Sequence, residues 1–107
     1  YYNIQFSAQF LNYSGNDDDV TVWFKKNNID VDFSASVAQV PPKHALGPGA
    51  TILALNYIDS FAADDYFELY WSSKSGETIL STFPPATSPT RPASPSLILT
   101  VTFVSAL

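Results

Sequence analysis

The stretch Tyr2-Asn3-Ile4-Gln5-Phe6-Ser7-Ala8-Gln9-Phe10 alternates apolar and polar side chains without interruption. Successive side chains of a β-strand point to opposite faces, so a period of two predicts a strand with one face in a core. Aromatic and β-branched residues also favour extended backbone. We therefore expect a half-buried strand from Tyr1 to Leu11.

The rest of the chain continues as short alternating runs separated by turn residues. The dipeptide Asn27-Asn28 suits a tight hairpin because Asn tolerates positive φ, and Pro41-Pro42 ends a strand because proline lacks a backbone donor. Residues 84–96 hold five prolines and predict an ordered but irregular crossover with polyproline character. The expected strands are 1–11, 20–25, 29–40, 51–60, 66–72, 78–83 and 97–104.

This pattern predicts one domain, residues 1–107, of the all-β class. No segment has the continuous 3.6-residue apolar stripe of a helix, and about seven short strands at such spacing are typical of an antiparallel sandwich or barrel. A length of 107 residues leaves no room for a second core.

The composition predicts an interface between subunits. Apolar residues make up 46% of the chain and charged residues only 14%, against roughly 25% in soluble domains. A small domain cannot hide so much apolar surface in one copy. The segment 66–72 is aromatic on both faces, so we expect one face in the core and the other against a partner. The candidate trimer interface is Tyr66, Glu68, Tyr70 and Trp71.

Three function classes are disfavoured by what the chain lacks. It has no cysteine, so disulfides and thiolate metal sites are excluded. It has a net charge of −5 and only five scattered basic residues, which argues against nucleic-acid binding. Its apolar runs are shorter than the ~20 residues of a membrane span, so we expect no membrane insertion.

Several stretches resemble a known family of β-proteins. They are the opening strand quoted above, Val22-Trp23-Phe24-Lys25-Lys26-Asn27, and Ala63-Asp64-Asp65-Tyr66-Phe67-Glu68-Leu69. In order and spacing they are similar to the jelly-roll heads of the complement globular-head and tumour-necrosis-factor superfamily. With the ending Pro92-Ala93-Ser94-Pro95-Ser96-Leu97, the chain resembles the form of these domains found in bacteriophage tail fibres and other virion surface proteins.

The resemblance covers nearly the whole chain but only the later two-thirds of such a head. It therefore implies an antiparallel jelly-roll β-sandwich that is incomplete at the N-terminus, together with a homotrimer and a binding or structural role. Asn28 and Asp64 stand where the family has glycine. Asn and Asp are the next best residues at positive φ, so both turns are expected to keep their shape.

Candidate sites for chemistry are sparse. Asp17-Asp18-Asp19 supplies the hard oxygen ligands that calcium prefers, but it lacks the ligand spacing of a calcium loop, and a solvated hairpin tip is the favoured interpretation. The dispersed carboxylates, which include Asp65 and Glu68, and the single histidine, His44, form no recognisable catalytic set. We assign no catalytic, cofactor-binding or metal-binding residue.

Recognition is expected on loops, because rigid scaffolds present binding residues there. The candidate receptor residues are Asn16, Asp17, Asp18, Asp19, Lys43, His44 and Lys74. Trp23, Tyr66, Tyr70 and Trp71 offer flat rings that suit sugar faces, although core or trimer packing is the more common role for such residues.

The resulting hypothesis is a non-enzymatic homotrimeric module on the virion surface, outside the cell, without a cofactor. It acts as a phage tail fibre or spike head for host attachment, or as a capsid decoration protein. Its partners are other virion structural proteins and, for attachment, a host cell-surface glycan or protein. The alternative is a cellular adhesin or lectin-like carbohydrate-binding domain, and the remote alternative is a glycan-cleaving enzyme.

Overall fold

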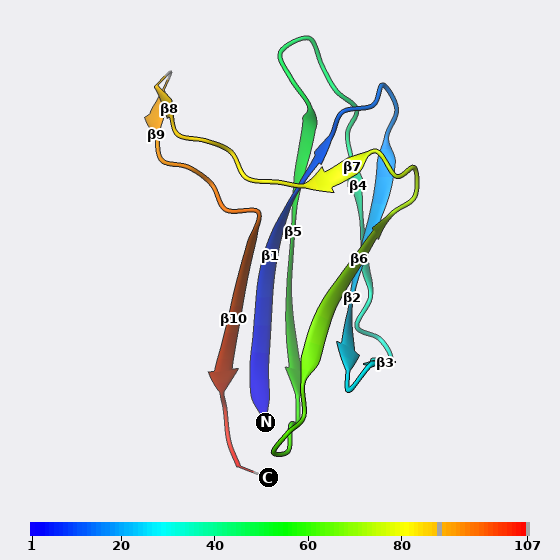
Figure 1. Ribbon diagram of the computed structural model, residues 1–107, viewed down its shortest axis with the longest axis vertical. Coiled ribbons are helices and arrows are strands. Elements are labelled where there is room, and N and C mark those ends of the chain that lie inside the picture. The colour runs from blue at the N-terminus through cyan, green and yellow to red at the C-terminus, as the bar shows by residue number, and fades with distance from the viewer. Residues whose placement is uncertain (88, 107) are drawn as a thin grey trace.

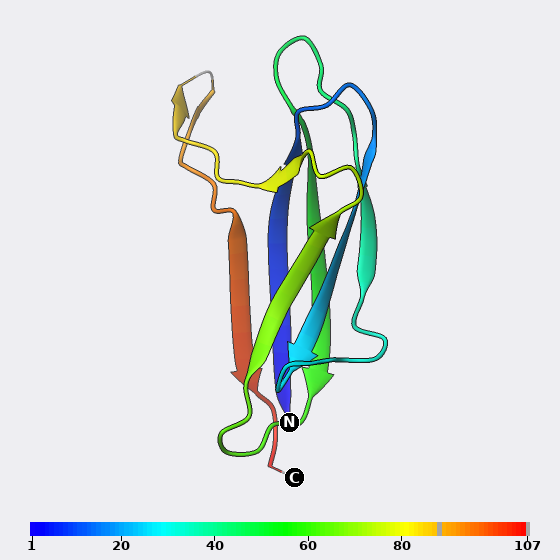
Figure 2. The ribbon, with the colours of Figure 1, turned by 45° about the vertical axis from the view of Figure 1, so that its right-hand side comes forward.

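The computed structural model describes residues 1–87 and 89–106, and these residues form strands and loops without a helix. Two antiparallel sheets, A and B, face each other, and a short two-stranded ribbon stands apart from them (Figures 1 and 2). The molecule is flat and elongated, with extents of 52 × 32 × 17 Å. The predicted all-β antiparallel sandwich is therefore confirmed, while the jelly-roll connectivity stays a prediction.

Sheet A is built around β1 (Tyr2–Asn12). One edge of β1 pairs along its whole length with β5 (Gly49–Asp59). The other edge pairs first with β10 (Leu97–Phe103) and then, near the end of β1, with β7 (Thr78–Leu80). Sheet A thus has four strands, with β1 in the centre, β5 on one side, and β10 and β7 end to end on the other (Figure 1).

Sheet B is built in the same way around β2 (Asp18–Lys26). β6 (Phe67–Ser73) pairs with one edge of β2. The other edge of β2 pairs with β4 (Ser36–Val40) along its first part and with β3 (Ile29–Asp30) at its end. β4 and β3 therefore lie end to end on the side of β2 opposite to β6. Each sheet therefore has one long central strand with a partner on both sides.

The core lies between the two central strands. Phe6 of β1 and Phe24 of β2 meet edge to face, with ring centroids 5.8 Å apart, and Phe10 contacts Trp71 of β6 at 5.1 Å. Full burial of each such side chain contributes about 1.5–3 kcal/mol, so this layer dominates the stability of the sandwich. The buried core side chains are Ile4, Phe6, Ala8, Phe10, Val20, Val22, Phe24 and Val40.

The turn chemistry is as the sequence predicts. Asn27 and Asn28 have φ of 52° and 66°, and they connect β2 to β3 as a tight hairpin. Asp64 has φ of 69° in the turn before β6. The two residues that stand where the resembling family has glycine therefore both adopt the left-handed conformation that glycine favours.

The strand expected over 29–40 is interrupted. β3 ends at Asp30, and pairing with β2 resumes only at Ser36. The buried Ser34 hydroxyl accepts a hydrogen bond from the Phe24 backbone N–H at 3.0 Å and donates to the Val31 carbonyl at 2.7 Å. A side chain thus replaces a backbone partner of β2, which breaks the ladder and leaves the residues between β3 and β4 as a loop.

The proline-rich crossover is more regular than expected. β8 (Ala86–Thr87) and β9 (Thr90–Arg91) pair as a small ribbon. The backbones of Phe83 and Ser94 also exchange hydrogen bonds, of 3.1 and 2.9 Å. The ribbon projects away from the two sheets near the β7 end of sheet A (Figures 1 and 2).

Candidate subunit interface

Among the residues that the structure describes, the outer face of sheet A carries no charged side chain. Residues directly opposite in paired strands point to the same face of a sheet, so the registers identify this face. We call it the uncharged face. Its residues are Asn3, Gln5, Ser7, Gln9 and Leu11 of β1, Ala50, Ile52, Ala54, Asn56 and Ile58 of β5, Ile79 of β7, and Ile98, Thr100 and Thr102 of β10.

The outer face of sheet B differs sharply. Asp19 and Lys25 lie on its central strand, and Lys25 is opposite Asp30 of β3 and Glu68 of β6. Lys25 Nζ lies 3.7 Å from the Asp30 carboxylate. The two outer faces therefore differ: that of sheet B carries charged side chains and that of sheet A does not. A sheet face without charge resembles the charge-poor centre of a protein interface more than an ordinary solvent-exposed surface.

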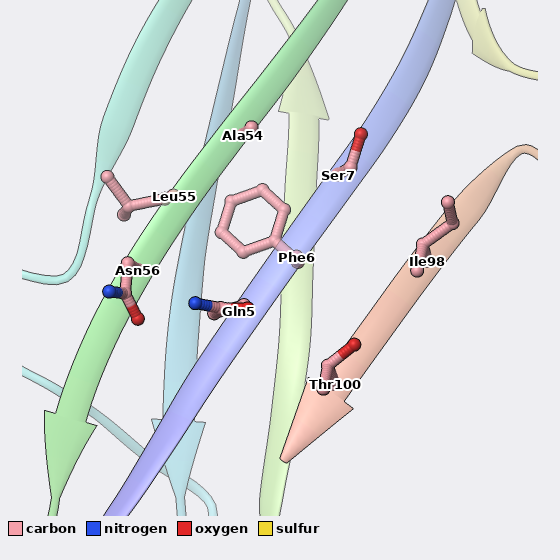
Figure 3. Close-up of a pocket in the computed structure, with 8 residues that line it drawn as sticks. All are labelled: Gln5, Phe6, Ser7, Ala54, Leu55, Asn56, Ile98 and Thr100. Carbon is pink, nitrogen blue, oxygen red and sulfur yellow. The ribbon is translucent and has the colours of Figure 1, made fainter. Parts of the chain in front are cut away.

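A trough runs along the middle of the uncharged face, over β1 (Figure 3). Its volume is about 390 Å³. Small or polar side chains make up most of its lining on this face, and Ile98 of β10, exposed by 53%, borders it. Elsewhere on the uncharged face, Ile52 and Ile58 of β5 are exposed by 64% and 57%. The lining side chains on the uncharged face are Gln5, Ser7, Ala54, Asn56, Ile98 and Thr100. This relief suits a protruding apolar partner better than a small ligand.

Most of the candidate receptor residues gather at one end of the sandwich. Asp17, Asp19 and Lys74 line a shallow hollow of about 370 Å³, and the Lys74 N–H donates to the Asp19 carbonyl at 2.9 Å. The side chain of Asn12 reaches the Asn16 carbonyl at 2.8 Å, which holds the loop before β2 in place. These predicted loop residues, far apart in sequence, thus share one surface.

The other two candidates lie in the neighbouring loop before β5. The Lys43 N–H donates to the Ser14 carbonyl at 2.8 Å, which joins this loop to the one before β2. His44 is exposed, and its Nδ1 accepts a hydrogen bond from the Leu46 N–H at 3.2 Å. The histidine therefore stabilises its own turn.

The sequence Asp17-Asp18-Asp19 was expected to form a solvated hairpin tip, but Asp18 is not exposed to solvent. It is buried at the start of β2, and its carboxylate accepts hydrogen bonds from the Ser73 hydroxyl, the Thr78 hydroxyl at 2.5 Å and the Ser75 N–H at 2.9 Å. Burial acts to raise the pKa of this carboxyl, but these donors outweigh it and lower the pKa from 3.8 to about 2. A carboxylate so occupied is not free to contact a receptor.

The same geometry bears on the calcium hypothesis. The groups around Asp18 are hydroxyl and amide donors, whereas a calcium site needs several oxygens that point their lone pairs inward. Within residues 1–87 and 89–106, no three Asp, Glu, His or Cys side chains are grouped so as to hold a metal ion.

The four aromatic-strand candidates do not share one face. Glu68 and Tyr70 lie on the outer face of sheet B, and Tyr66, just before β6, is half exposed. Trp71 points to the opposite side and packs on Phe10 in the core. The structure therefore separates Trp71 from the other proposed interface residues.

Tyr70 instead has Trp23 as its neighbour. The two rings are 5.9 Å apart and inclined by 36°. The Trp23 Nε1–H donates to Asp30 at 3.0 Å, and Lys25 Nζ lies 4.6 Å from the centre of the Tyr70 ring. Of the suggested sugar-stacking platform, only this pair comes together on a surface.

The remaining carboxylates of interest are engaged in turns and ion pairs. The Asp65 carboxylate accepts the Ala62 N–H at 2.7 Å and the Asn27 side-chain N–H at 2.9 Å, and these bonds lower its pKa. Asp59 lies 3.8 Å from Lys26. Both carboxylates thus serve the turns that flank β5 and β6.

Comparisons with known proteins identify no relative, because no family model, no curated protein and no solved structure matches the chain. In the part of the chain that the structure describes, there is no helix that is long and apolar enough to cross a membrane.

The uncharged face was not predicted from the sequence, although the neutral outward positions of each strand can be read from it. The outward positions of β1 are all neutral, and so are those of β5 and β10. Only the register shows that these three runs lie side by side. Reading the outward positions of each predicted strand for charge would have found the three neutral runs, but not that they form one face.

Proposed function

We propose that this chain is a non-enzymatic β-sandwich module that assembles as a homotrimer on the outside of a virus particle. The observation that carries the proposal is the uncharged face, which we take as the surface between copies. Buried interface centres are depleted in charged residues and enriched in apolar ones. An acidic protein that keeps every charge off one whole sheet face has the surface that such an interface requires.

The uncharged face is a better interface than the outer face of β6. The latter carries Glu68, with Lys25 and Asp30 beside it, and burying these charges costs free energy unless every one finds a partner. On the uncharged face, Ile52, Ile58 and Ile98 exclude water upon association without that cost. We therefore place the trimer contact on sheet A in preference to Tyr66, Glu68 and Tyr70.

The virion setting and the number of copies rest on the resemblance to jelly-roll heads of bacteriophage surface proteins. A fibre or spike head and a capsid decoration protein both need a stable trimer with loops turned outward. The clustering of the Asp17, Asp19 and Lys74 loops at one end of the sandwich fits either role. The genes beside this one separate the two: a long repetitive upstream region supports a fibre, and a neighbouring major capsid gene supports decoration.

The oligomeric state tests this proposal directly. Light scattering of the purified protein should give three times the chain mass of 11.7 kDa. Ile98→Asp should shift the mass to that of the monomer, whereas Tyr70→Asp and Val37→Asp, on the outer face of sheet B, should leave it unchanged. A wild-type protein that stays monomeric at micromolar concentration rejects the trimer. Dissociation by Tyr70→Asp alone places the interface on β6 instead.

A carbohydrate-binding module is the second candidate, and the Trp23–Tyr70 pair favours it. Two neighbouring rings with the Asp30 carboxylate alongside can stack on a sugar and accept hydrogen bonds from its hydroxyls. Glycan-array binding that is lost in Trp23→Ala and kept in Tyr66→Ala would support this function. Absence of binding to any glycan in the wild-type trimer argues against it.

A further inference from the structure

Phe33, in the loop between β3 and β4, has an unusual conformation for an exposed residue. Its φ is 61° and its side chain is fully exposed. Left-handed backbone is unfavourable for a bulky side chain, and it persists only where the surrounding structure imposes it. Here the buried Ser34 hydroxyl accepts a hydrogen bond from the Phe24 N–H and donates one to the Val31 carbonyl, which fixes the loop. The chain therefore holds an aromatic ring out in solvent at a conformational cost.

An aromatic hollow lies on the other long side of the sandwich, where β6 faces β10. Its volume is about 470 Å³, and a cavity of about 150 Å³ is enough to bind benzene. The rings of Tyr2, Phe61 and Phe67 line it, and the Phe61 centroid lies 6.0 Å from that of Tyr2 and 5.7 Å from that of Phe67. Val101 of β10, exposed by 48%, also lines it. The hollow thus has the size and the chemistry to receive a further aromatic ring.

Phe33 and the aromatic hollow are placed as the two halves of a contact between copies. β3 pairs with the edge of β2 opposite to β6, and β3 and β10 stand on opposite long sides of the sandwich (Figures 1 and 2). Both features lie towards the end that holds the N-terminus (Figure 1). In a closed ring of copies, each subunit contacts the next through two different surfaces at one height along the axis. Phe33 and the hollow meet this condition.

We infer that Phe33 of one copy inserts into the aromatic hollow of the next copy around the threefold axis. This inference rests on the proposed trimer and names the residue that each subunit contributes to its neighbour. The inserted ring packs on the aromatic rings of the hollow and covers Val101, as the buried aromatic anchor of an interface does. Of the described residues that line the hollow, only Asp65 is charged. Its carboxylate already accepts hydrogen bonds from the Ala62 N–H and the Asn27 side chain, so it needs no partner from the next copy.

The aromatic hollow also adjoins the uncharged face, which we take as the surface between copies. Strand β10 borders both surfaces, because Ile98 and Thr100 lie on the uncharged face and Val101 lines the hollow. A neighbour that packs on the uncharged face therefore reaches the hollow across a single strand. The Phe33 contact is thus the outer continuation of the proposed interface.

Phe33→Asn removes the ring and spares the loop, because Asn tolerates left-handed backbone. Light scattering over a dilution series should show association about tenfold weaker or more, as expected for the loss of an aromatic anchor. At a dilution where the chain is monomeric, the variant should unfold at an unchanged or higher urea concentration. The matched control is Leu46→Asn, which should associate as the wild type does. Leu46 is exposed by 94% and lies in the loop between β4 and β5, at the other end of the sandwich (Figure 1). Equal association of the two variants overturns the inference and leaves the trimer in place.

Cross-linking locates the contact, because the chain has no cysteine of its own. A short thiol-specific cross-linker should join a mixture of Phe33→Cys chains and Val101→Cys chains into covalent dimers. Chains that carry both substitutions should give a covalent trimer, whereas Leu46→Cys in place of Phe33→Cys should give none.

The outcomes separate this inference from the proposed trimer. A double variant that is trimeric by light scattering but forms no cross-link overturns the inference alone. A cross-linked ladder that continues past three chains supports the Phe33 contact and rejects the closed trimer, because a head-to-tail contact that does not close forms an open filament. A wild-type protein that is monomeric, with no cross-link in the double variant, overturns both.

Discussion

The hydroxyl of Thr78 donates a hydrogen bond of 2.5 Å to the carboxylate of Asp18, which lies 60 residues earlier in the chain. Asp18 begins β2 in sheet B, and Thr78 begins β7 in sheet A, so this buried bond joins the two sheets at one end of the sandwich. The turn between β6 and β7 adds the Ser73 hydroxyl and the Ser75 N–H to the same carboxylate. The Asp18 side chain thus holds the turn between β6 and β7 in place.

We predict that Asp18→Asn destabilises the protein by about 2–3 kcal/mol, because hydrogen bonds to a charged group are worth about 1.5–3 kcal/mol and an amide cannot accept all three donors. Urea unfolding followed by tryptophan fluorescence measures this. Asp17→Asn removes the neighbouring exposed carboxylate and serves as the control, with a change of less than about 0.5 kcal/mol. Equal losses of unfolding free energy in the two variants would show that the buried hydrogen bonds to Asp18 stabilise the fold no more than an exposed carboxylate does.

The stability should also fall with acid in a defined window. The folded pKa of Asp18, about 2, lies below its ordinary value of 3.8, so the carboxylate stabilises the fold fully above pH 4. This contribution is lost progressively as the pH falls from about 4 to about 2. Unfolding free energies measured at pH 5, 3.5 and 2.5 should show the loss, and Asp18→Asn should reduce the slope. A slope that is unchanged in the variant assigns the acid sensitivity to other carboxylates.

Gly49 should tolerate no side chain. A Cβ at this position would lie 1.9 Å from the Pro41 carbonyl oxygen and 2.7 Å from that of Pro42, and both are backbone atoms that cannot rotate away. Gly49→Ala should therefore cost about 1–3 kcal/mol by forcing the 41–49 loop from β5. Gly15→Ala, where no atom lies within 4 Å, should be nearly neutral. Thermal unfolding of the two variants measures the difference. If Gly49→Ala is as stable as Gly15→Ala, the 41–48 loop moves away from β5 without cost.

Phe33 should be a site of stored strain. It has φ of 61° and its side chain is fully exposed. A bulky residue thus adopts the left-handed backbone conformation, and no burial of its ring within the same chain offsets the cost. Phe33→Gly should raise the unfolding free energy of the isolated chain by up to about 1 kcal/mol. If the variant is destabilised instead, the Phe33 ring has a packing partner in the assembled protein, and light scattering will then show weakened association.

The alternating pattern of Tyr2 to Phe10 was enough to place β1 and its buried face, because period-two alternation is a local signal. The same holds for the Asn27-Asn28 hairpin, whose geometry depends on two residues alone. The pairing of strands, in contrast, does not follow from a local pattern. β1 lies between β5 and β10, strands that begin about 50 and 100 residues away in sequence, and no local pattern specifies that order.

The site was less predictable for the same reason. Asp17, Asp18 and Asp19 look equivalent in sequence, and only the distant Ser73 and Thr78 distinguish the middle one. Alternation separates Tyr70 from Trp71, but it cannot say which of two aromatic faces turns inward. That choice depends on Phe10, which fills the space opposite Trp71.

If the module binds host cells, we predict that it does so through the loop surface around Asn16, His44 and Lys74. Lys74→Ala and Asn16→Ala should weaken attachment of the purified trimer to cells, since these residues lie at the shallow hollow beside Asp19 or in the loop that borders it. The unfolding free energy should change by less than about 0.5 kcal/mol, because exposed loop side chains add little to the core.

Salt dependence gives this prediction a second readout. The chain has a net charge of −5 and few cations, so recognition should rely on hydrogen bonds and aromatic contact, which salt screens weakly. Raising the salt from about 0.05 to 0.3 M should therefore change attachment less than about threefold. A steep loss of attachment would indicate long-range charge attraction instead. Polysaccharide hydrolysis that disappears in Glu68→Gln or Asp65→Asn would make the module an enzyme, because a binding loop has no need of either carboxylate.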